Sequence, residues 1–347
     1  MLRCVDACCG VGGFSAGAME CGCDVILGID NDKIVQTWAA NTAGRALCAT
    51  IGEDSIEWPD PTDDLFFHIS PPCTVLSRAN STATDVERAC GLDFVRWSLD
   101  HVMHKGYRFW SWENVCTAAT KAVLAEYCTK FPDRIASVQL DAADYSTPQS
   151  RIRLIASSPE IIRTLKQTPV HRVSVAQAFA AANQPLPAQY LRSNTNNRDG
   201  SYCIRSVQRE AFTCTASHPL TWCQPDGQTV RCCTAAEQAI LQGFPKSWKF
   251  PSGSRLAIRA IGNATSHLRS LRRSSVPHRT WRAARSLYRR RLRHPRPRGV
   301  PNASTTSTRC HVMITANFGV EWNAWKRLSD SKSVGRSLKY DKINRKP

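Results

Sequence analysis

One thiol in this sequence stands at a place where a strand must stop. Residues 65–69 are an apolar run that predicts a buried strand. Pro71 and Pro72 end it, because proline lacks the amide donor that a strand ladder needs. Cys73 follows at once, and the carboxyl edge of an open α/β sheet is where catalysis takes place. Cys73 is therefore a candidate nucleophile, although the stretch taken alone fits a small structural cysteine better.

Three more side chains with catalytic chemistry lie near predicted strand ends. Residues 107–115 are an aromatic-rich strand that carries Glu113 close to its end. If this strand is parallel to the one before Cys73, the carboxylate and the thiol share one edge of the sheet. A later strand begins near Arg151 and Arg153, and alternation places both on the same face. Taken alone, the two arginines are better explained by a solvated sheet edge.

A glycine-rich turn near the N-terminus predicts a nucleotide-type cofactor. Gly10, Gly12 and Gly13 fall between a predicted strand and a helical pattern, where glycine lets the backbone approach a ligand closely. Asp30 follows about 20 residues later, at the end of the next strand, which is the usual position of a ribose-binding acid. The alternative is an ordinary strand–helix turn, which leaves the acid unexplained.

A sheet of strands joined by helices must position these residues. Predicted strands cover residues 2–6, 24–29, 45–50, 65–69, 107–115, 135–140 and 152–157, and predicted helices cover 32–42, 85–104, 116–130 and 234–243. Thr234 and Glu237 have the spacing of a capping box at the start of the last helix. Strands that alternate with helices predict an α/β fold.

Composition divides the chain into four parts. Residues 1–166 carry the strand–helix alternation, residues 167–226 lose it and become rich in Asn, Gln, Ser, Thr and Pro, and residues 227–266 regain it. Residues 267–347 hold 21 of the 46 Lys and Arg residues but 3 of the 28 Asp and Glu residues. This tail carries the whole net charge of +18 and has no core-forming period, so it is predicted to be solvated and disordered.

Composition also excludes several classes of protein. None of the 16 cysteines forms a CxxC pair, so zinc-ribbon and thioredoxin sites have no support. We find no signal-peptide pattern and no apolar run of about 18 residues that would span a membrane. We therefore expect an intracellular protein with reduced cysteines, in a prokaryotic or virus-infected cytoplasm or in a nucleus, with no bound metal.

Taken in order, the motifs resemble the cytosine-C5 DNA methyltransferase family over residues 2–266. The matching segments are Asp6-x-x-x-Gly10-x-Gly12-Gly13, Asp30, Pro71-Pro72-Cys73, Glu113-Asn114-Val115, Gln149-x-Arg151-x-Arg153, Arg231-x-x-Thr234-x-x-Glu237-x-x-x-Leu241-Gln242-Gly243-Phe244-Pro245 and Gly262-Asn263-Ala264. Each motif is common by itself, but the ordered set is specific. The resemblance implies a Rossmann-like S-adenosylmethionine-dependent fold, a catalytic domain in residues 1–166 completed by 227–266, and a target-recognition region in 167–226.

The resemblance also implies a role for each matching residue. Cys73 would attack C6 of a flipped-out cytosine, Glu113 would donate to N3, and Arg153 would hold O2. Arg151 would support either the loop or the backbone, and the loop from Thr74 to about Arg88 would close over the base. The implied cofactor residues are Asp6, Gly10, Gly12, Gly13, Phe14, Asp30, Pro72 and Asn263. The enzyme would be a DNA (cytosine-5-)-methyltransferase that acts on double-stranded DNA as a monomer.

Three positions depart from the family pattern. Cys8 replaces the Phe that usually covers the cofactor, and Thr74 replaces a common Gln after the nucleophile. After Ala264 the chain continues with Thr265 and the arginine tail, where the family commonly has Val-Pro-Pro and an apolar helix. The tail is either a divergent or frame-shifted end or a basic DNA-binding arm.

Several alternatives remain at this level. An RNA cytosine methyltransferase would use the same fold and chemistry, and an inert nucleic-acid-binding protein would keep the fold without turnover. A nicotinamide-dependent oxidoreductase explains the glycine turn but leaves Cys73, Glu113 and Arg153 unexplained. Restriction–modification, viral genome marking and gene silencing are all roles that such a DNA enzyme could serve.

Overall fold

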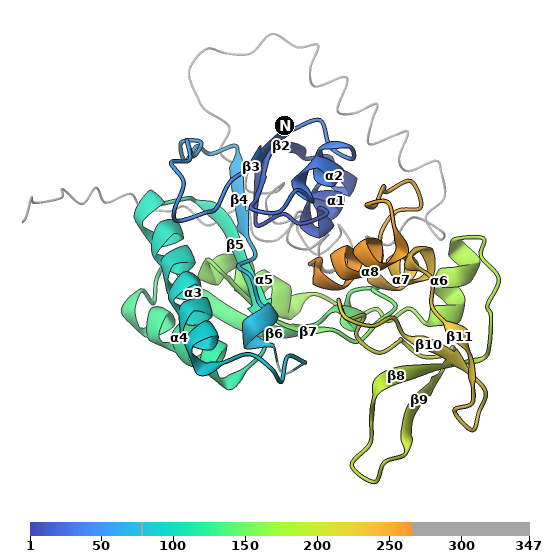
Figure 1. Ribbon diagram of the computed structural model, residues 1–347. Coiled ribbons are helices and arrows are strands. Elements are labelled where there is room, and N and C mark those ends of the chain that lie inside the picture. Colours follow the sequence, from blue (N-terminus) through green and yellow to red (C-terminus); the bar gives the residue numbers. More distant parts are fainter. Residues whose placement is uncertain (78, 266–347) are drawn as a thin grey trace, which may run out of the picture.

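The computed structural model describes residues 1–77 and 79–265, and the predicted basic tail lies outside them. Its main body is a seven-stranded sheet with helices on both faces (Figure 1). In spatial order the strands are β3 (Arg45–Cys48), β2 (Asp24–Asp30), β1 (Arg3–Ala7), β4 (Leu65–Ile69), β5 (Phe109–Val115), β7 (Ile152–Ser157) and β6 (Ala136–Asp141). Neighbouring strands are parallel except that β7 is antiparallel to both β5 and β6.

Two apolar layers cover the two faces of this sheet. One packs against α3 (Asp85–Lys105) and α4 (Ala118–Lys130). The other packs against α1 (Gly13–Glu20), α2 (Val35–Ala39) and α5 (Pro159–Gln167). Because both faces are covered, β4 is buried along its whole length, which explains its nearly continuous apolar sequence. No helix in the described part of the chain is both long and apolar enough to cross a membrane.

A second sheet lies to one side of the body (Figure 1). Its four antiparallel strands are β11 (Thr229–Cys232), β10 (Thr221–Cys223), β8 (Tyr190–Asn196) and β9 (Tyr202–Ser206). It has its own apolar core with α6 (Val175–Ala181) and α7 (Ala235–Gln242), in which the rings of Phe179 and Trp222 meet edge to face at 5.4 Å. These strands were not predicted, because they are short and mix polar with apolar residues without a clear period.

One local detail shortens a predicted helix, and another confirms a predicted helix start. The helix predicted over 32–42 is reduced to α2, because Asp32 accepts a bond from the Ile34 amide and holds the preceding residues in a turn. The capping box of Thr234 and Glu237 at the start of α7 is confirmed. Arg231 also pairs with Glu237 at 2.6 Å, so the spacing of this motif serves the helix start. The remaining elements are α8 (Ser254–Asn263) and the short 3₁₀ turns η1 (Thr74–Leu76) and η2 (Ala142–Asp144).

Candidate active site

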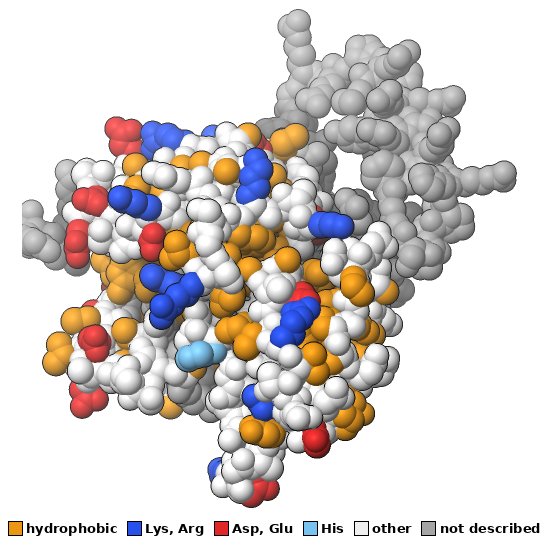
Figure 2. Space-filling model, turned by 45° about the vertical axis from the view of Figure 1, so that its right-hand side comes forward, with side chains coloured by type: hydrophobic (Ala, Val, Ile, Leu, Met, Phe, Trp, Pro, Cys, Tyr) orange, Lys and Arg blue, Asp and Glu red, His pale blue; other side chains and the backbone are white. Residues whose placement is uncertain are grey.

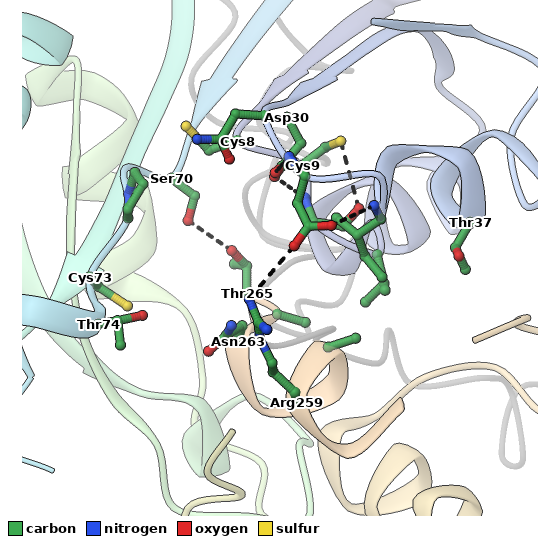
Figure 3. A pocket seen from close by; sticks show the side chains of 18 of the residues that line it. Cys8, Cys9, Asp30, Thr37, Ser70, Cys73, Thr74, Arg259, Asn263 and Thr265 are labelled. Atoms are coloured by element: carbon green, nitrogen blue, oxygen red, sulfur yellow. Dashed lines mark hydrogen bonds and ion pairs between the residues drawn. The ribbon is translucent and has the colours of Figure 1, made fainter. Parts of the chain in front are cut away.

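A cavity of about 420 Å³ opens at the carboxyl edge of the main sheet. Its walls come from the turn after β1, the end of β2, the segment after β4, the neighbouring ends of β5 and β7, and α8 with the residues that follow it (Figure 3). Strand order reverses between β1 and β4, and α/β folds bind ligands at such a switch point. The predicted site residues that line it are Gly10, Asp30, Pro72, Cys73, Glu113, Arg151, Arg153 and Asn263.

Glu113 has a defined partner for each carboxylate oxygen. The Ser70 hydroxyl donates to Oε2 at 2.6 Å, and Nε of Arg153 forms an ion pair with Oε1 at 2.8 Å. The carboxylate is buried, with 5% of the residue exposed. Because β7 runs antiparallel to β5, its first residues lie at the edge where β5 ends. Strand direction therefore brings Arg153 to Glu113.

Cys73 is half-buried at the same edge and lines the same cavity. The Asn114 side chain donates to the Pro71 carbonyl at 3.1 Å and fixes the segment that carries the thiol. Burial raises the pKa of Cys73, and the positive charges of Arg153 and Arg151 oppose that rise. The site thus contains a half-buried thiol beside two cations that favour its thiolate form.

Arg151 lies directly before β7 and lines the same cavity as Arg153, but its contacts are different. Its guanidinium donates to the carbonyls of Cys214, Gly262 and Ala264, each at 3.0 Å. It is 3% exposed, and burial lowers its pKa to about 9. These bonds tie β7 to the loop before β10 and to the end of α8. Arg151 therefore holds backbone segments together at the rim of the cavity.

The glycine turn forms the opposite wall of the cavity. Cys8 and Gly10 have φ values of 59° and 52°, so the backbone turns through the left-handed region there. The Gly10 amide donates to Oδ2 of Asp30 at 2.8 Å. Burial raises the pKa of Asp30. An acid and a backbone turn thus lie together, as a nucleoside-type ligand requires.

Two of the predicted cofactor residues lie behind this wall. Asp6 accepts from the Ser15 hydroxyl at 2.5 Å, and burial raises its pKa to about 7. Phe14 stacks on His68 with ring centroids 4.0 Å apart. Neither Asp6 nor Phe14 lines the cavity. Both pack beneath the turn and support it from within the core.

Gly12 and Gly13 also lie outside the cavity lining, and close packing explains both glycines. A Cβ on Gly12 would come within 2.9 Å of the Trp38 ring, and the residue has φ 89°. A Cβ on Gly13 would lie 2.0 Å from the Thr265 carbonyl oxygen. The segment after α8 therefore packs directly on the glycine turn.

Ser70 and Thr265 are cavity residues that the sequence prediction did not assign. Their hydroxyls lie 2.9 Å apart, and Figure 3 shows them pointing toward one another. The available signal was a hydroxyl residue next to the Pro-Pro-Cys motif and another directly after Gly-Asn-Ala. Among the described residues that line the cavity none is aromatic, and Cys8 occupies the position of the expected Phe.

Comparison with known proteins identifies the family. The sequence profile of the C-5 cytosine-specific DNA methylase matches residues 2–199, more than half of the chain. The chain belongs to this family. Type II methyltransferase M.HgiDI of Herpetosiphon aurantiacus is 25% identical over 287 residues, which cover 76% of this chain and 90% of that protein.

Solved structures of other methyltransferases have the same fold as this chain. A protein named as a DNA modification methyltransferase encoded within a prophage (E. coli) gives a TM-score of 0.52 at 18% identity, covering 77% of this chain and 96% of its own. The methyltransferase EhMeth of Entamoeba histolytica gives 0.50 at 13% identity, covering 77% and 95%. The predicted Rossmann-like α/β fold is confirmed.

Family membership implies S-adenosylmethionine as the methyl donor, and the cavity suits such a ligand. Its volume is in the range of small-molecule sites, and it places the backbone turn and Asp30 on one side and Cys73 on the other. Within residues 1–77 and 79–265, no cluster of three or more His, Cys, Asp or Glu side chains could hold a metal ion.

Proposed function

We propose that this protein is a DNA (cytosine-5-)-methyltransferase that transfers a methyl group from S-adenosylmethionine to C5 of a flipped-out cytosine. The observation that carries the proposal is the convergence of Cys73, Glu113 and Arg153 on a cavity that the glycine turn also lines. A nucleophile, a carboxyl group and a cation beside a cofactor turn are the parts that this reaction requires.

The cofactor half of the cavity would hold the methyl donor. Asp30 would accept from the ribose hydroxyls, and the backbone near Gly10, together with Pro72 and Asn263, would enclose the rest. Bound S-adenosylmethionine supplies an electrophilic methyl group. Asp6, with Gly12, Gly13 and Phe14, would shape the turn from behind the wall.

The nucleophile half would activate the base. The Cys73 thiolate forms a bond to C6, and the electron pair displaced through the ring is taken up at N3, which Glu113 protonates. C5 is then nucleophilic enough to accept the methyl group. A solvent base then removes the C5 proton, the electron pair of the C5–H bond re-forms the C5–C6 double bond, the Cys73 thiolate leaves C6, and the N3 proton returns to Glu113. Arg153 orients Glu113, holds the base at O2 and favours the thiolate.

The base must leave the duplex to reach this cavity, because C5 and C6 are inaccessible within stacked DNA. We propose that the loop 74–88 closes over it. At its far end, Arg88 donates to the carbonyls of Val75 at 3.1 Å and Asn80 at 2.9 Å. These bonds hold the loop to the start of α3. When the loop closes, either the start of α3 moves with it or these bonds break.

We propose that the second sheet reads the sequence around the target. We propose that residues 167–226 form the target-recognition region, beside a catalytic domain of residues 1–166 and 227–266. The sequence prediction placed β11 (Thr229–Cys232) in the catalytic domain, but this strand pairs with β10 in the second sheet and therefore belongs with the recognition region. Figure 2 shows Lys and Arg side chains on both the main body and the second sheet on one face of the molecule. Such charges suit phosphate contacts on both sides of a bound duplex.

Bisulfite sequencing of DNA from cells that express the chain tests this proposal. We expect methylated cytosines within one recurring sequence, and none in cells that express Cys73→Ser. Methyl transfer in vitro to transfer RNA but not to duplex DNA would make the substrate RNA. DNA binding without transfer to either nucleic acid would show an inert homologue. Because the relative M.HgiDI is named a Type II methyltransferase, we propose that the protein serves restriction–modification and acts inside a cell.

A further inference from the structure

Two hydroxyl groups connect the catalytic carboxylate to the end of the described chain. The Thr265 hydroxyl lies 2.9 Å from that of Ser70, which donates to Oε2 of Glu113 at 2.6 Å. Ser70 and Thr265 are 195 residues apart in the sequence. Figure 3 shows Thr265 reaching the Ser70 side chain from the segment after α8. The result is a continuous chain of three side chains that ends on the carboxylate.

The position of Thr265 is fixed by buried contacts. The Ala264 carbonyl accepts from Arg151 at 3.0 Å and from Gln242 at 2.8 Å. The carbonyl of Thr265 packs where a side chain at Gly13 would stand. Gln242 is fully buried, and unpaired donors at such a place are costly. The backbone on both sides of the threonine is therefore held, and its hydroxyl is held against Ser70.

The direction of these bonds depends on the proton of Glu113. A serine hydroxyl has one proton, so when Ser70 donates to an ionised Glu113, Thr265 must be the donor to Ser70. A proton on Glu113 belongs on Oε2, because the positive Nε of Arg153 lies 2.8 Å from Oε1. The protonated carboxyl group then donates to Ser70. Ser70 in turn donates to Thr265, and both bonds reverse while the heavy atoms stay in place.

We infer that Ser70 and Thr265 are positioning residues that hold Glu113 in its productive orientation in both of its protonation states. The inference rests on the proposed function, in which Glu113 gains and loses a proton in each cycle. The inference also explains why a hydroxyl residue, Thr265, follows Gly262-Asn263-Ala264. Serine at position 265 would serve equally well, and valine would not.

Steady-state methylation of a duplex substrate by Thr265→Val, Thr265→Ser and wild type tests this inference. Thr168→Val is the matched control, since Thr168 is a half-buried threonine whose hydroxyl bonds only locally, to the Thr164 carbonyl, and lies outside the cavity. We expect Thr265→Val to lower kcat by about tenfold, the effect of one lost hydrogen bond at the transition state. We expect KM for cofactor and DNA to change by less than about twofold, with Thr265→Ser and the control near wild type.

Ser70→Ala supplies a second measurement if Thr265→Val fails to fold, as thermal unfolding would show. It removes the donor to the carboxylate itself, and bonds to charged groups are the stronger ones, so kcat should fall further than in Thr265→Val. The inference is overturned if Thr265→Ser is as slow as Thr265→Val, if only KM for the cofactor rises, or if kcat does not change. An inactive wild type would instead refute the proposed function.

Discussion

The two sheets of this molecule place their polar side chains in opposite ways. At the carboxyl edge of the seven-stranded sheet, Glu113 and Arg151 are 5% and 3% exposed, and each is paired inside the protein. In the four-stranded sheet, every residue of β11 and the last three residues of β8 are exposed. Buried paired charges interact strongly because water does not screen them. Exposed polar groups remain free to contact a large partner.

This contrast predicts where each kind of effect should be found. Changes at the edge of the main sheet should act on turnover, and changes in the exposed strands should act on DNA binding. Between the two sheets, Arg151 and Gln149 hold the loop at Cys214, since the Gln149 side chain accepts from the Cys214 amide at 2.8 Å. Changes at this connection should act on stability.

Among changes that leave the Cys73 nucleophile in place, the largest effect is expected for Glu113→Gln. Glutamine keeps the shape of the side chain and removes its proton, and a general acid contributes roughly 10²- to 10⁴-fold to the rate. We expect single-turnover methyl transfer to slow by that factor, with cofactor binding unchanged. Glu126→Gln is the control, because Glu126 is an exposed residue in a surface ion pair with Arg96. A loss of less than about fivefold would remove Glu113 from the mechanism.

Arg151→Met and Arg153→Met should separate stability from turnover. The first leaves three carbonyls without their shared donor, and we expect the free energy of unfolding to fall by about 3 kcal/mol. The second removes the partner of Glu113 and should lower kcat with a smaller loss of stability. Urea unfolding and kinetics on both variants give the measurement. The reverse pattern would contradict the functions assigned to the two arginines.

His68 should make the stability of the main sheet depend on pH. Burial lowers its pKa to about 3, and the unfolded value is about 6.5. The folded state therefore binds fewer protons than the unfolded state between these values, so stability is lost as pH falls below about 6.5. Between pH 7.5 and pH 5, the free energy of unfolding of wild type should therefore fall by about 2 kcal/mol more than that of His68→Phe, as measured by urea unfolding. An equal loss in both proteins would show a charged histidine in the fold.

The smallest effect is expected at the tip of the β8–β9 hairpin. Arg198 is exposed there, and removal of one phosphate contact lowers the salt dependence of DNA binding by about one unit of slope. We expect Arg198→Ala to weaken DNA binding by less than about tenfold without a change in kcat. Binding measured across a series of salt concentrations tests this. A fall in kcat at saturating DNA would place the hairpin in the catalytic step.

The sequence predicted the parts of the site that follow from strand ends. Cys73 and Glu113 could be placed together because parallel strands end at one edge, and β4 and β5 are parallel. The common face of Arg151 and Arg153 follows from alternation, and both line the cavity. The pairing of Arg153 with Glu113 could not be predicted, because it depends on the reversed direction of β7.

Other features depend on packing between distant segments. Phe14 lies next to the glycine turn in sequence, but its ring stacks on His68 in the core, since helix α1 turns this side chain toward the sheet. The contact of Ser70 with Thr265 could not be predicted, because both are common residue types and they are 195 residues apart in the sequence. The strands of the second sheet lack the alternation that makes a strand recognisable.

The covalent bond between Cys73 and the target base is the central claim, and a modified substrate tests it directly. In duplex DNA with 5-fluorocytosine at the target, the C5 proton that must leave is replaced by fluorine, so Cys73 cannot be expelled after methyl transfer. Mass spectrometry of the denatured protein, after incubation with cofactor and this duplex, should show one DNA strand attached at Cys73. Methylation of ordinary DNA without any such adduct would contradict the account.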